Sequence, residues 1–366
     1  MKLLVTGGHI SPALAFIDEF VERNNRIVFV GRKYSNERDR SITFEYREVQ
    51  KRKIPFQHIK TGRFTRILSF RNLSNLLFIP VGFLQSFYIL RKEKPDAILT
   101  FGGYIAFPVA IIGWFMKIPL YTHEQTIHPG MTNRVVGMFA RKVFISFEDS
   151  KRYFPSHKIV YSGNPIRGEI FKTLDIPFPV SQIKQTIYIT GGSLGAHSIN
   201  VHIKNILPQL LEKYTVIHQT GNVAEYNDHQ QLLALRSQLP EDLKQRYFLR
   251  EHFSSSEIGY VYSIADIVVG RCGANTFFEL IALKKPSVIV PLPWSAYGEQ
   301  EKQAQLLQSA GVAEIFHQSE ESAKLLAIIA KMIDNKEAHT AHFDKLNSLY
   351  KKNAAEIISQ TILASQ

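Results

Sequence analysis

The sequence predicts an α/β protein built from two parallel sheets, each covered by helices. Three observations lead to this fold class. Short apolar β-rich runs alternate with helical periodicity, glycine clusters follow several of those runs, and the scheme occurs twice along 366 residues. Strands that are apolar throughout are typical of parallel sheets with both faces buried. At roughly 150 residues per domain, the length also fits two domains.

The first half opens with a buried strand at 3–5, followed by glycines and a helix with Leu14, Ile17, Phe20 and Val21 on one stripe. Further strands are expected at 27–30, 97–100, 119–122, 143–146 and 158–161, with an apolar helix at 105–116. The start of the chain has one charge and a short apolar run, so no secretory signal is expected. The apolar stretch 73–90 is interrupted by polar residues, proline and glycine, so no transmembrane helix is expected there.

The second half repeats the pattern, with strands expected at 186–190, 215–219, 267–269 and 287–290. Gly163-Asn164-Pro165 and a polar, proline-bearing stretch at 172–185 indicate a seam between the halves near residue 165. The segment 336–366 is helical in pattern, and its apolar residues could pack on either domain.

Charge is divided unequally between the halves. The net charge is +12, yet residues 1–163 hold 25 basic and 12 acidic side chains, a net charge of +13, while residues 164–366 carry −1. With 45% hydrophobic and 21% charged residues, the chain is globular rather than disordered. Cys272 is the only cysteine, so no internal disulfide or Cys/His zinc pattern exists, and a reducing cytoplasmic setting is favoured.

Four glycine clusters are expected where strands end and helices begin. They are Thr6-Gly7-Gly8-His9, Phe101-Gly102-Gly103-Tyr104, Thr190-Gly191-Gly192-Ser193-Leu194-Gly195 and Gly270-Arg271-Cys272-Gly273-Ala274. Such turns let the backbone approach an anion, and the following helix offers unpaired N–H groups, which makes the third cluster the best diphosphate cradle. Plain tight turns are the alternative for any one cluster. Neither a dinucleotide GxGxxG pattern with its acid nor a P-loop lysine motif is present.

Polar residues near these turns are candidate site residues. His9 lies between a strand and the helix start Ser11-Pro12, so its imidazole is expected to face a cleft and to suit a general base, although a structural role is the alternative. Glu279 is placed to accept hydrogen bonds from a ribose diol or to be a solvated helix charge. No DxD pair occurs, so no metal is expected, and helix dipoles with Arg167 would neutralise a diphosphate.

Taken in order, these motifs extend over nearly the whole chain. They are Thr6-Gly7-Gly8-His9 with Pro12-Ala13-Leu14, Phe101-Gly102-Gly103-Tyr104, His123-Glu124-Gln125 with Pro129-Gly130 and Thr132-Asn133, Gly163-Asn164-Pro165-Ile166-Arg167, Gly191-Gly192-Ser193-Leu194-Gly195-Ala196, Arg271-Cys272-Gly273-Ala274 through Glu279, and Gln300 with Ala304. Each is weak alone, but their order and spacing are specific. Together they resemble the MurG family, the peptidoglycan N-acetylglucosaminyltransferases that make lipid II from lipid I.

The resemblance implies a GT-B fold with an acceptor and membrane-associating domain at 1–163, a UDP-sugar donor domain at 164–340, and a C-terminal helix at 341–366 that packs back on the first domain. The implied donor is UDP-N-acetylglucosamine. Ser193 and Arg167 would contact its diphosphate, Glu279 the ribose, Glu299 and Gln300 the sugar, and Phe253 the uracil, with Thr126 facing the donor. The nucleotide would be lined by Gly273, Ala274, Asn275, Thr276, Phe277 and Phe278.

The implied acceptor is lipid I, undecaprenyl-pyrophosphoryl-N-acetylmuramoyl-pentapeptide. Thr6, Gly7 and Gly8 would hold its diphosphate, and His9 would deprotonate its 4-hydroxyl for an inverting displacement. Tyr104, His123, Glu124 and Gln125 are the other acceptor-side residues. Neither a cofactor nor a metal is implied.

The sequence departs from the family pattern at four places. The first glycine loop is about three residues shorter than the usual GGTGGH, Thr126 replaces Asn, Cys272 replaces Ser, and Glu299 stands where Gln or His precedes Gln300. Threonine cannot copy an amide, and an ionised glutamate only accepts hydrogen bonds, so these changes bear on sugar selectivity or on hydrogen-bond pairing.

A lipid-linked acceptor implies a peripheral position on the cytoplasmic side of the membrane. Cations flank the apolar stretch 73–90, and Trp114 and Phe115 end a second apolar helix; the cations are Arg63, Arg66, Arg71, Arg91 and Lys92. An apolar patch with a basic rim is typical of a surface that binds anionic lipid, although both helices could simply cover the sheet. Cell-wall synthesis proteins are further expected partners. No nucleic-acid-binding motif accompanies the positive charge, so nucleic acid is not expected as a partner.

Three alternatives remain open at this point. Two are GT-B enzymes, namely a glycolipid glycosyltransferase with another acceptor and a UDP-N-acetylglucosamine 2-epimerase. The third is a non-catalytic UDP-sugar-binding protein of cell-wall assembly.

Overall fold

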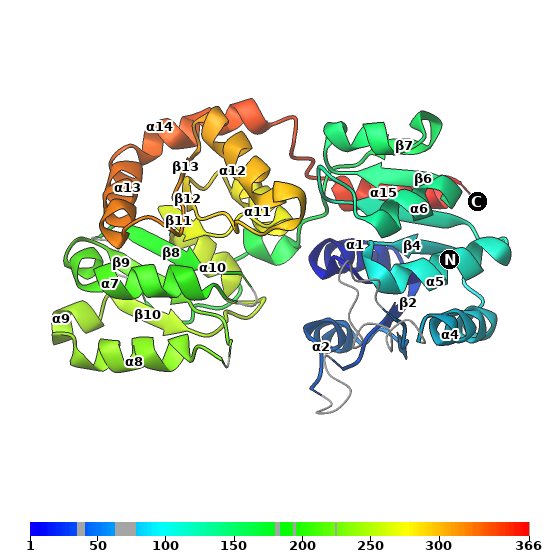
Figure 1. The fold of residues 1–366 in the computed structure, drawn as a ribbon, viewed down its shortest axis with the longest axis horizontal. Helices are drawn as coiled ribbons and strands as arrows, with labels where there is room; N and C mark the ends of the chain where they lie inside the picture. Colours follow the sequence, from blue (N-terminus) through cyan, green and yellow to red (C-terminus); the bar gives the residue numbers. More distant parts are fainter. Residues whose placement is uncertain (35–40, 63–77, 180–183, 193–194, 224, 366) are drawn as a thin grey trace. The chain divides into compact units, whose positions relative to one another are not determined.

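The computed structural model describes residues 1–366 except 35–40, 63–77, 180–183, 193–194, 224 and 366. The chain forms two compact units (Figure 1), Met1–Arg167 with Lys351–Gln366, and Gly168–Tyr350. The expected divisions lay after residues 163 and 340. The segment 341–350 stays with the second unit because its apolar side chains, Phe343 and Leu346, are buried there.

The first unit is a parallel sheet with helices on both faces. Its strands are β1 (Lys2–Thr6), β2 (Arg26–Gly31), β3 (Phe56–His58), β4 (Ala97–Thr100), β5 (Leu120–Glu124), β6 (Lys142–Ile145) and β7 (Ile159–Tyr161). Within the described residues they lie in the order β3-β2-β1-β4-β5-β6-β7, and all pairs are parallel. Its helices are α1 (Ile10–Glu22), α2 (Phe44–Lys51), α4 (Phe78–Glu93), α5 (Gly103–Phe115), α6 (Met131–Phe139) and α15 (Ala354–Ala364), with short 3-10 helices η1 (Glu148–Tyr153) and η2 (Ser156–Lys158).

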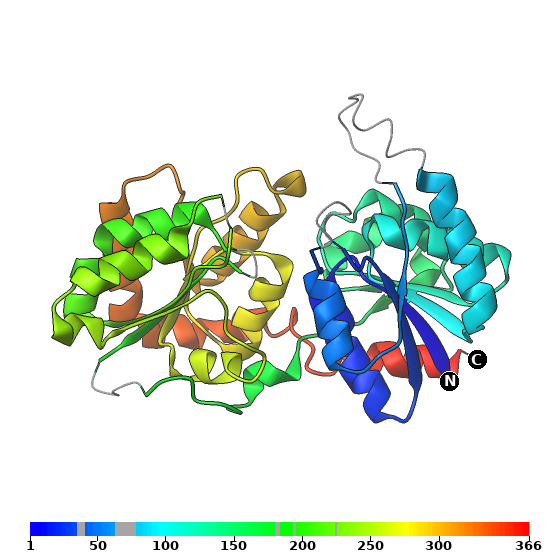
Figure 2. The ribbon, with the colours of Figure 1, turned by 90° about the horizontal axis from the view of Figure 1, so that it is seen from below.

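Alternate residues of β1 face two separate cores, as expected for a strand in the middle of a sheet. Leu3 and Val5 pack with α1, α2 and α15, whereas Leu4 packs with α4, α5 and α6. Helix α15 lies along α1 (Figure 2), and its Ile358 and Ile362 are fully buried. Each such side chain contributes about 1.5–3 kcal/mol, so this burial anchors the end of the chain to the first unit.

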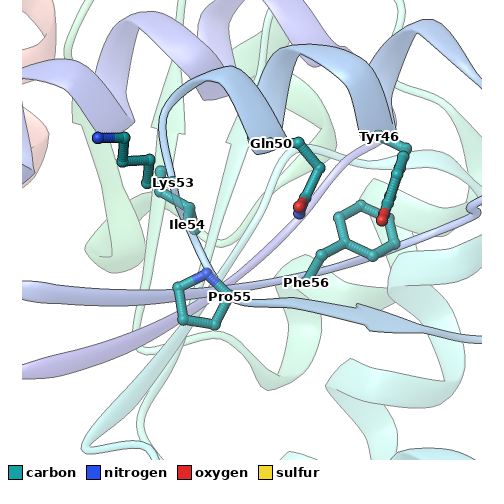
Figure 3. A pocket seen from close by; sticks show the side chains of 6 residues that line it. All are labelled: Tyr46, Gln50, Lys53, Ile54, Pro55 and Phe56. Carbon is teal, nitrogen blue, oxygen red and sulfur yellow. The ribbon is translucent and has the colours of Figure 1, made fainter.

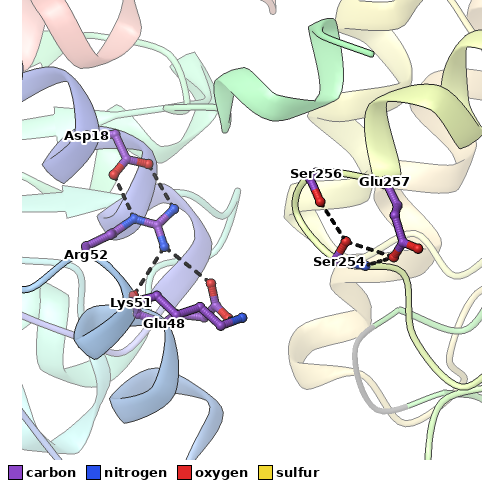
Figure 4. Close-up of polar contacts among 7 residues, drawn as sticks. All are labelled: Asp18, Glu48, Lys51, Arg52, Ser254, Ser256 and Glu257. Carbon is purple, nitrogen blue, oxygen red and sulfur yellow. Dashed lines mark hydrogen bonds and ion pairs between the residues drawn. The ribbon is translucent and has the colours of Figure 1, made fainter. Parts of the chain in front are cut away.

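Helix α2 is tied to α1 by an arginine (Figure 4). The guanidinium of Arg52 donates to both oxygens of Asp18 at 2.7 and 2.9 Å, and to Glu48 at 3.3 Å. A two-pronged contact of this kind fixes direction as well as distance. It therefore fixes the C-terminal end of α2 against α1.

The second unit repeats the arrangement. Its strands are β8 (Thr186–Thr190), β9 (Thr215–Gln219), β10 (Tyr247–Arg250), β11 (Ile267–Gly270), β12 (Ser287–Ile289) and β13 (Ala313–Ile315), in the order β10-β9-β8-β11-β12-β13 among the described residues, and all are parallel. Its helices are η3 (Gly168–Phe171), α7 (His197–Lys213), α8 (Asp228–Gln238), α9 (Glu241–Lys244), α10 (Ile258–Ile264), α11 (Ala274–Leu283), η4 (Ala296–Gly298), α12 (Glu299–Ala310), α13 (Ser322–Asp334), α14 (Lys336–Ala341) and η5 (His342–Leu346). The fold class predicted from the sequence is confirmed.

Details of the prediction differ from the structure in three ways. Strands β3, β10 and β13 were not predicted, because each has only three or four residues and is partly polar. Val21, expected on the buried stripe of α1, is 43% exposed. The segment 336–366 is not one helix: α14 and η5 belong to the second unit and α15 to the first, so the chain leaves helical conformation between them.

Candidate functional site

Two glycine loops of the first unit lie backbone against backbone. They follow the neighbouring strands β1 and β4, and the N–H of His9 donates to the carbonyl of Phe101 at 3.1 Å. A Cβ on Gly8 would lie 2.1 Å from the carbonyl oxygen of Gly102, and one on Gly103 would lie 2.8 Å from the Cα of Gly8. Only glycine allows this approach, which places His9 at the carboxyl end of the sheet.

His9 is the N-cap residue of α1. Its side chain is partly buried and makes no capping hydrogen bond. Burial lowers the pKa of His9 below its ordinary value of 6.5, and the negative charge of Glu124 opposes this shift. The imidazole is therefore neutral at neutral pH, which is the form that a general base requires.

Glu124 ends β5 and is held by donors on both oxygens. It accepts the N–H of Thr126 at 2.9 Å and its hydroxyl at 2.6 Å, and the amide of Asn133 at 2.8 Å. Asn133, on α6, also donates to the carbonyl of His123 at 3.1 Å. Thr126 thus turns its hydroxyl toward Glu124. Asn133, which belongs to the Thr132-Asn133 motif but was not predicted as a site residue, fixes the Glu124 carboxylate whose charge acts on His9.

His123 is buried behind this network. Its Nε2 lies 3.2 Å from the carbonyl oxygen of Gly163 and 3.2 Å from the hydroxyl of Ser146. Burial lowers the pKa of His123 to about 4, so the ring is neutral and its Nε2–H donates to the Gly163 carbonyl. His123, on β5, is thus linked to the segments that follow β6 and β7.

Four residues expected to contact the acceptor are buried. Thr6, His123, Glu124 and Gln125 are 0, 1, 1 and 5% exposed. Their side chains are buried at the carboxyl end of the sheet, and their contact with an acceptor stays a prediction. Gly7 is buried as well, whereas Gly8 is exposed and His9 and Tyr104 are partly exposed.

Two further polar groups adjoin this site. The hydroxyl of Tyr104 accepts from Arg32 at 2.6 Å. Glu45, on the first turn of α2, packs its side chain against Gly7 and Gly31. A Cβ on Gly7 would lie 2.7 Å from the Glu45 Oε1, and a Cβ on Gly31 would lie 1.8 Å from it. That oxygen is buried without a hydrogen-bond partner among the described residues. Burial raises the pKa of Glu45 to about 7, against the opposing charge of Arg32. No sequence motif identified Arg32 or Glu45.

In the second unit, Gln219 joins the loops after β8 and β10. Its amide nitrogen donates to the carbonyl of Gly192 at 3.1 Å and to the hydroxyl of Thr190 at 3.3 Å, and its oxygen accepts the N–H of Phe253 at 3.2 Å. It was not predicted, because a glutamine at the end of a strand carries no signal in one sequence. Ser193, the expected diphosphate contact, lies outside the described residues.

The loop after β8 is packed closely against the one after β9. A Cβ on Gly195 would lie 2.1 Å from the carbonyl oxygen of Thr220, and Gly195 has a φ of +84°. Asn200, on α7, donates to that same carbonyl at 3.1 Å and to Asp228 at 2.8 Å. The start of α7 is thereby fixed beneath the proposed diphosphate loop.

Helix α11 begins at the carboxyl end of β11, the strand that pairs with β8. Gly273, Ala274, Asn275 and Thr276 are partly exposed there. Phe277 and Phe278 are 0% exposed because their side chains pack in the core, and their expected place beside a nucleotide stays a prediction. The unpaired N–H groups of this first turn suit an anion or an acceptor atom of a ligand.

Aromatic side chains connect Phe253 with Glu279. Phe253 and Tyr262 both lie edge-on to Tyr188, with ring centroids 6.2 and 5.4 Å away, and the Tyr262 hydroxyl donates to Glu279 at 3.0 Å. Glu279 is 5% exposed, so it is not a solvated helix charge. The turn after Phe253 is fixed by the N–H and hydroxyl of Ser254, which both donate to Glu257 at 2.8 Å (Figure 4).

The residues expected to contact the donor sugar begin α12. The amide oxygen of Gln300 accepts the N–H of Leu292 at 3.1 Å, which leaves its amide nitrogen as a donor for a ligand. Glu299 is 9% exposed and accepts from Gln303 at 3.2 Å. Arg167 is the last residue of the first unit and is partly buried, and its contact with a diphosphate stays a prediction.

Cys272 and the carboxylate and histidine side chains offer no further chemistry within the described residues. Cys272 is fully buried, and burial raises the pKa of its thiol, so it is not a nucleophile. Among the residues that the structure describes, no three His, Cys, Asp or Glu side chains come together as metal ligands. Over the same ranges no helix has both the length and the apolar character to cross a membrane.

A hollow of about 520 Å³ lies between α2 and β3 (Figure 3), lined by Tyr46, Gln50, Lys53, Ile54, Pro55 and Phe56. It opens at the amino end of β3, whereas ligands of open α/β sheets bind outside the carboxyl ends of the strands. The glycine loops, and not this hollow, are therefore the candidate site.

Residues 6–145 match the glycosyltransferase family 28 N-terminal domain, and residues 186–361 match the C-terminal domain of that family. The UDP-N-acetylglucosamine–N-acetylmuramyl-(pentapeptide) pyrophosphoryl-undecaprenol N-acetylglucosamine transferase 2 of Bacillus cereus is 30% identical over 372 residues, which cover 99% of each chain. The transferase of the same name, without a number, from Myxococcus xanthus is 32% identical, covering 96% of this chain and 88% of its own.

Solved structures show the same fold. MurG of Acinetobacter baumannii superposes with a TM-score of 0.71 at 23% identity, covering 99% of both chains. The UDP-GlcNAc 2-epimerase of Neisseria meningitidis, bound to UDP-GlcNAc, gives a TM-score of 0.68 at 17% identity and covers both chains completely. The fold is that of a GT-B glycosyltransferase. More narrowly, the chain belongs to glycosyltransferase family 28, which confirms the resemblance to the MurG family.

Proposed function

We propose that this chain transfers N-acetylglucosamine from UDP-N-acetylglucosamine to the 4-hydroxyl of N-acetylmuramic acid in lipid I, giving lipid II with inversion at the anomeric carbon. The names of the relatives support this substrate pair. The observation that carries the proposal is the neutral imidazole of His9 at the exposed Gly8 turn, close enough to the fixed carboxylate of Glu124 for that charge to act on it.

His9 is the general base. As the acceptor oxygen attacks the anomeric carbon, its proton passes to the imidazole, and the bond between that carbon and the UDP oxygen breaks with its electrons leaving on UDP. Glu124, held by Thr126 and Asn133, stabilises the imidazolium that forms. The acceptor diphosphate lies at the exposed Gly8 turn, with Tyr104 and Arg32 beside it.

The second unit holds the donor. The N–H groups at the starts of α7 and α11 take up the charge of the diphosphate, assisted by Ser193 and Arg167. Gly273 to Thr276 line the nucleotide, with Phe253 at the uracil and Glu279 at the ribose. Gln300 donates its amide to a sugar hydroxyl, and Glu299 lies beside it.

An assay with UDP-N-acetylglucosamine and a lipid I analogue tests the reaction. UDP release is expected only when both substrates are present. Epimerised sugar formed without acceptor would identify an epimerase instead, and turnover with another glycolipid but not with lipid I would reassign the acceptor.

His9→Ala separates an enzyme from a silent binding protein. We expect donor binding to persist and turnover to fall by about 10²–10⁴-fold, the usual contribution of a general base. His157→Ala, at an exposed histidine of the same unit, is the matched control. Intact donor binding and biological activity in His9→Ala, with no turnover in the parent protein either, would favour the non-catalytic alternative. Turnover that is unchanged from an active parent would show that another group is the base.

We also propose that the first unit binds the anionic cytoplasmic face of the membrane. Helices α4 and α5 pack side by side (Figure 1). Their outer surface exposes apolar side chains, namely Phe78, Leu84 and Tyr88 on α4, and Trp114 and Phe115 on α5, at 43–69%. Arg91, Lys92 and Lys117 lie at the ends of these helices, and Arg63, Arg66 and Arg71 lie outside the described residues. Each basic residue near anionic lipid contributes about 1 kcal/mol.

Co-sedimentation with phosphatidylglycerol vesicles measures this association. Binding should weaken as salt is added, and it should weaken further in Leu84→Ser with Phe115→Ser. Leu174→Ser, an exposed leucine of the second unit, is the control. Weak binding that is insensitive to salt would contradict the proposal.

A further inference from the structure

The loop from β12 to α12, residues 291–298, exposes two aromatic rings. Trp294 is 73% exposed and Tyr297 is 46% exposed. Within the part of the chain that the structure describes, Trp294 has neither a hydrogen bond nor a contact with another ring. A large ring left in water forgoes the free energy that burial would supply, and a ligand that covers the ring would recover it.

The loop that carries these rings is fixed by its own hydrogen bonds. Ser295 donates its N–H to Leu292 at 3.1 Å and accepts that of Gly298 at 3.0 Å, and the Ser295 hydroxyl accepts the N–H of Gln300 at 3.3 Å. Tyr297 is held at a φ of 56° and a ψ of 21°, a left-handed conformation that a tyrosine rarely adopts. Such a conformation persists where the surrounding structure imposes it.

The loop lies at the carboxyl end of β12, which pairs with β11, the strand whose end leads to the first turn of α11. The aromatic loop and the proposed nucleotide turn therefore occupy neighbouring positions on one edge of the sheet. Residues 291–300 contain no Lys or Arg and a single acid, Glu299, so this segment does not suit a phosphate or an anionic lipid. Exposed rings within six residues of an amide donor and a carboxylate suit a neutral ring that carries hydroxyls on its rim and C–H groups on its face.

We propose that Trp294 and Tyr297 form an aromatic platform on which the pyranose ring of the nucleotide sugar stacks. The electron-rich face of an aromatic ring attracts the partly positive C–H groups of the sugar, while Gln300 binds a hydroxyl at its rim. The platform then adds affinity for the sugar to that for the nucleotide. The inference rests on the proposed function in taking a UDP-sugar as the ligand of the second unit.

Fluorescence tests this contact directly, because the chain has only two tryptophans. In Trp114→Phe, Trp294 is the sole tryptophan emitter. Titration with UDP-N-acetylglucosamine should change its emission, and titration with UDP should change it little. No response to the UDP-sugar, or an equal response to UDP, would overturn the proposal.

Affinity provides the second measurement. Trp294→Ala should raise the dissociation constant for UDP-N-acetylglucosamine by about 2–10-fold and leave that for UDP unchanged, the range expected for one aromatic contact. Trp294→Tyr should restore most of the affinity, and Trp294→Leu should not. Trp114→Phe is the matched control at the other exposed tryptophan. Unchanged sugar affinity in Trp294→Ala, or a loss of vesicle binding in its place, would overturn the platform.

Failure of the proposed function gives a different result. If UDP-N-acetylglucosamine binds with the Trp294 response but no sugar reaches lipid I, the acceptor assignment fails and the platform stands. If lipid II forms at the normal rate and affinity in Trp294→Ala, the platform fails and the reaction stands.

Discussion

Replacing Glu45 by glutamine should stabilise the first unit, and the gain should grow with pH. Glu45 has one carboxyl oxygen enclosed between Gly7 and Gly31 without a hydrogen-bond partner in the described ranges. Burial disfavours the charged form and raises the pKa of Glu45 from 4.5 to about 7, despite the positive charge of Arg32. Glutamine has nearly the same shape and does not ionise.

The direction follows from proton binding. The folded protein holds the Glu45 proton more tightly than the unfolded chain does, so the associated stability is fully present below pH 4.5 and is lost as pH rises to about 7. At 1.36 kcal/mol per pKa unit, this rise corresponds to about 3 kcal/mol at most. Part of the residue is exposed to solvent, which screens the charge, so we expect a gain of about 1–3 kcal/mol for Glu45→Gln between pH 5 and pH 8.

Urea unfolding at the two pH values measures this difference. Trp114 lies in the first unit, so its fluorescence in a Trp294→Phe background reports the unfolding of that unit. Glu22→Gln, which removes an exposed carboxylate of α1, controls for the change in net charge. A stability difference between Glu45→Gln and the parent that is the same at pH 5 and pH 8 would falsify the reasoning.

Three further perturbations test the site. The acid limb of the kcat/KM pH profile should lie below pH 6.5, because burial lowers the pKa of His9. Glu124→Gln should move this limb to still lower pH, because it removes the negative charge that raises the His9 pKa. A limb that does not move in Glu124→Gln would show that Glu124 does not act on His9. Gly8→Ala should destabilise the first unit by about 1–3 kcal/mol in urea unfolding, because the new methyl group would meet the backbone of Gly102. Gly130→Ala is the control, because a Cβ there would meet no atom within 4 Å. Equal effects of the two substitutions would refute the close approach at Gly8. Gln219→Leu should weaken UDP-N-acetylglucosamine binding in calorimetry by about tenfold, because the loops it joins lose their hydrogen bonds, and unchanged binding would show that those loops hold themselves.

Most of the fold could be predicted from the sequence, since it depends on local patterns. Buried parallel strands are apolar along their whole length, and the glycine turns mark where they end. The short strands β3, β10 and β13 could not be predicted, because three or four partly polar residues carry too little pattern. Their strand conformation comes from pairing with a neighbour that is distant in the chain.

The candidate site divides in the same way. Motif order predicts that His9, Glu279 and the start of α11 belong to the site. It did not separate Phe277 and Phe278, which are core residues, from their exposed neighbours, because the orientation of a helical side chain depends on what the helix packs against. Gln219 and Glu45 belong to no motif, and their positions are known only from the residues that enclose them.

The sequence by itself determined the fold class, the family and the order of the glycine loops along the chain. Each of these depends on short motifs and on strand and helix patterns whose residues are neighbours in the chain. Tertiary structure alone decided which loops meet, which carboxylates are buried and which aromatic rings stay in water. Those properties arise where strands distant in sequence end at one edge of a sheet. There, the packing of Gly8 against the Gly102 backbone, which leaves no room for a Cβ, and the enclosed oxygen of Glu45 both depend on residues distant in the chain.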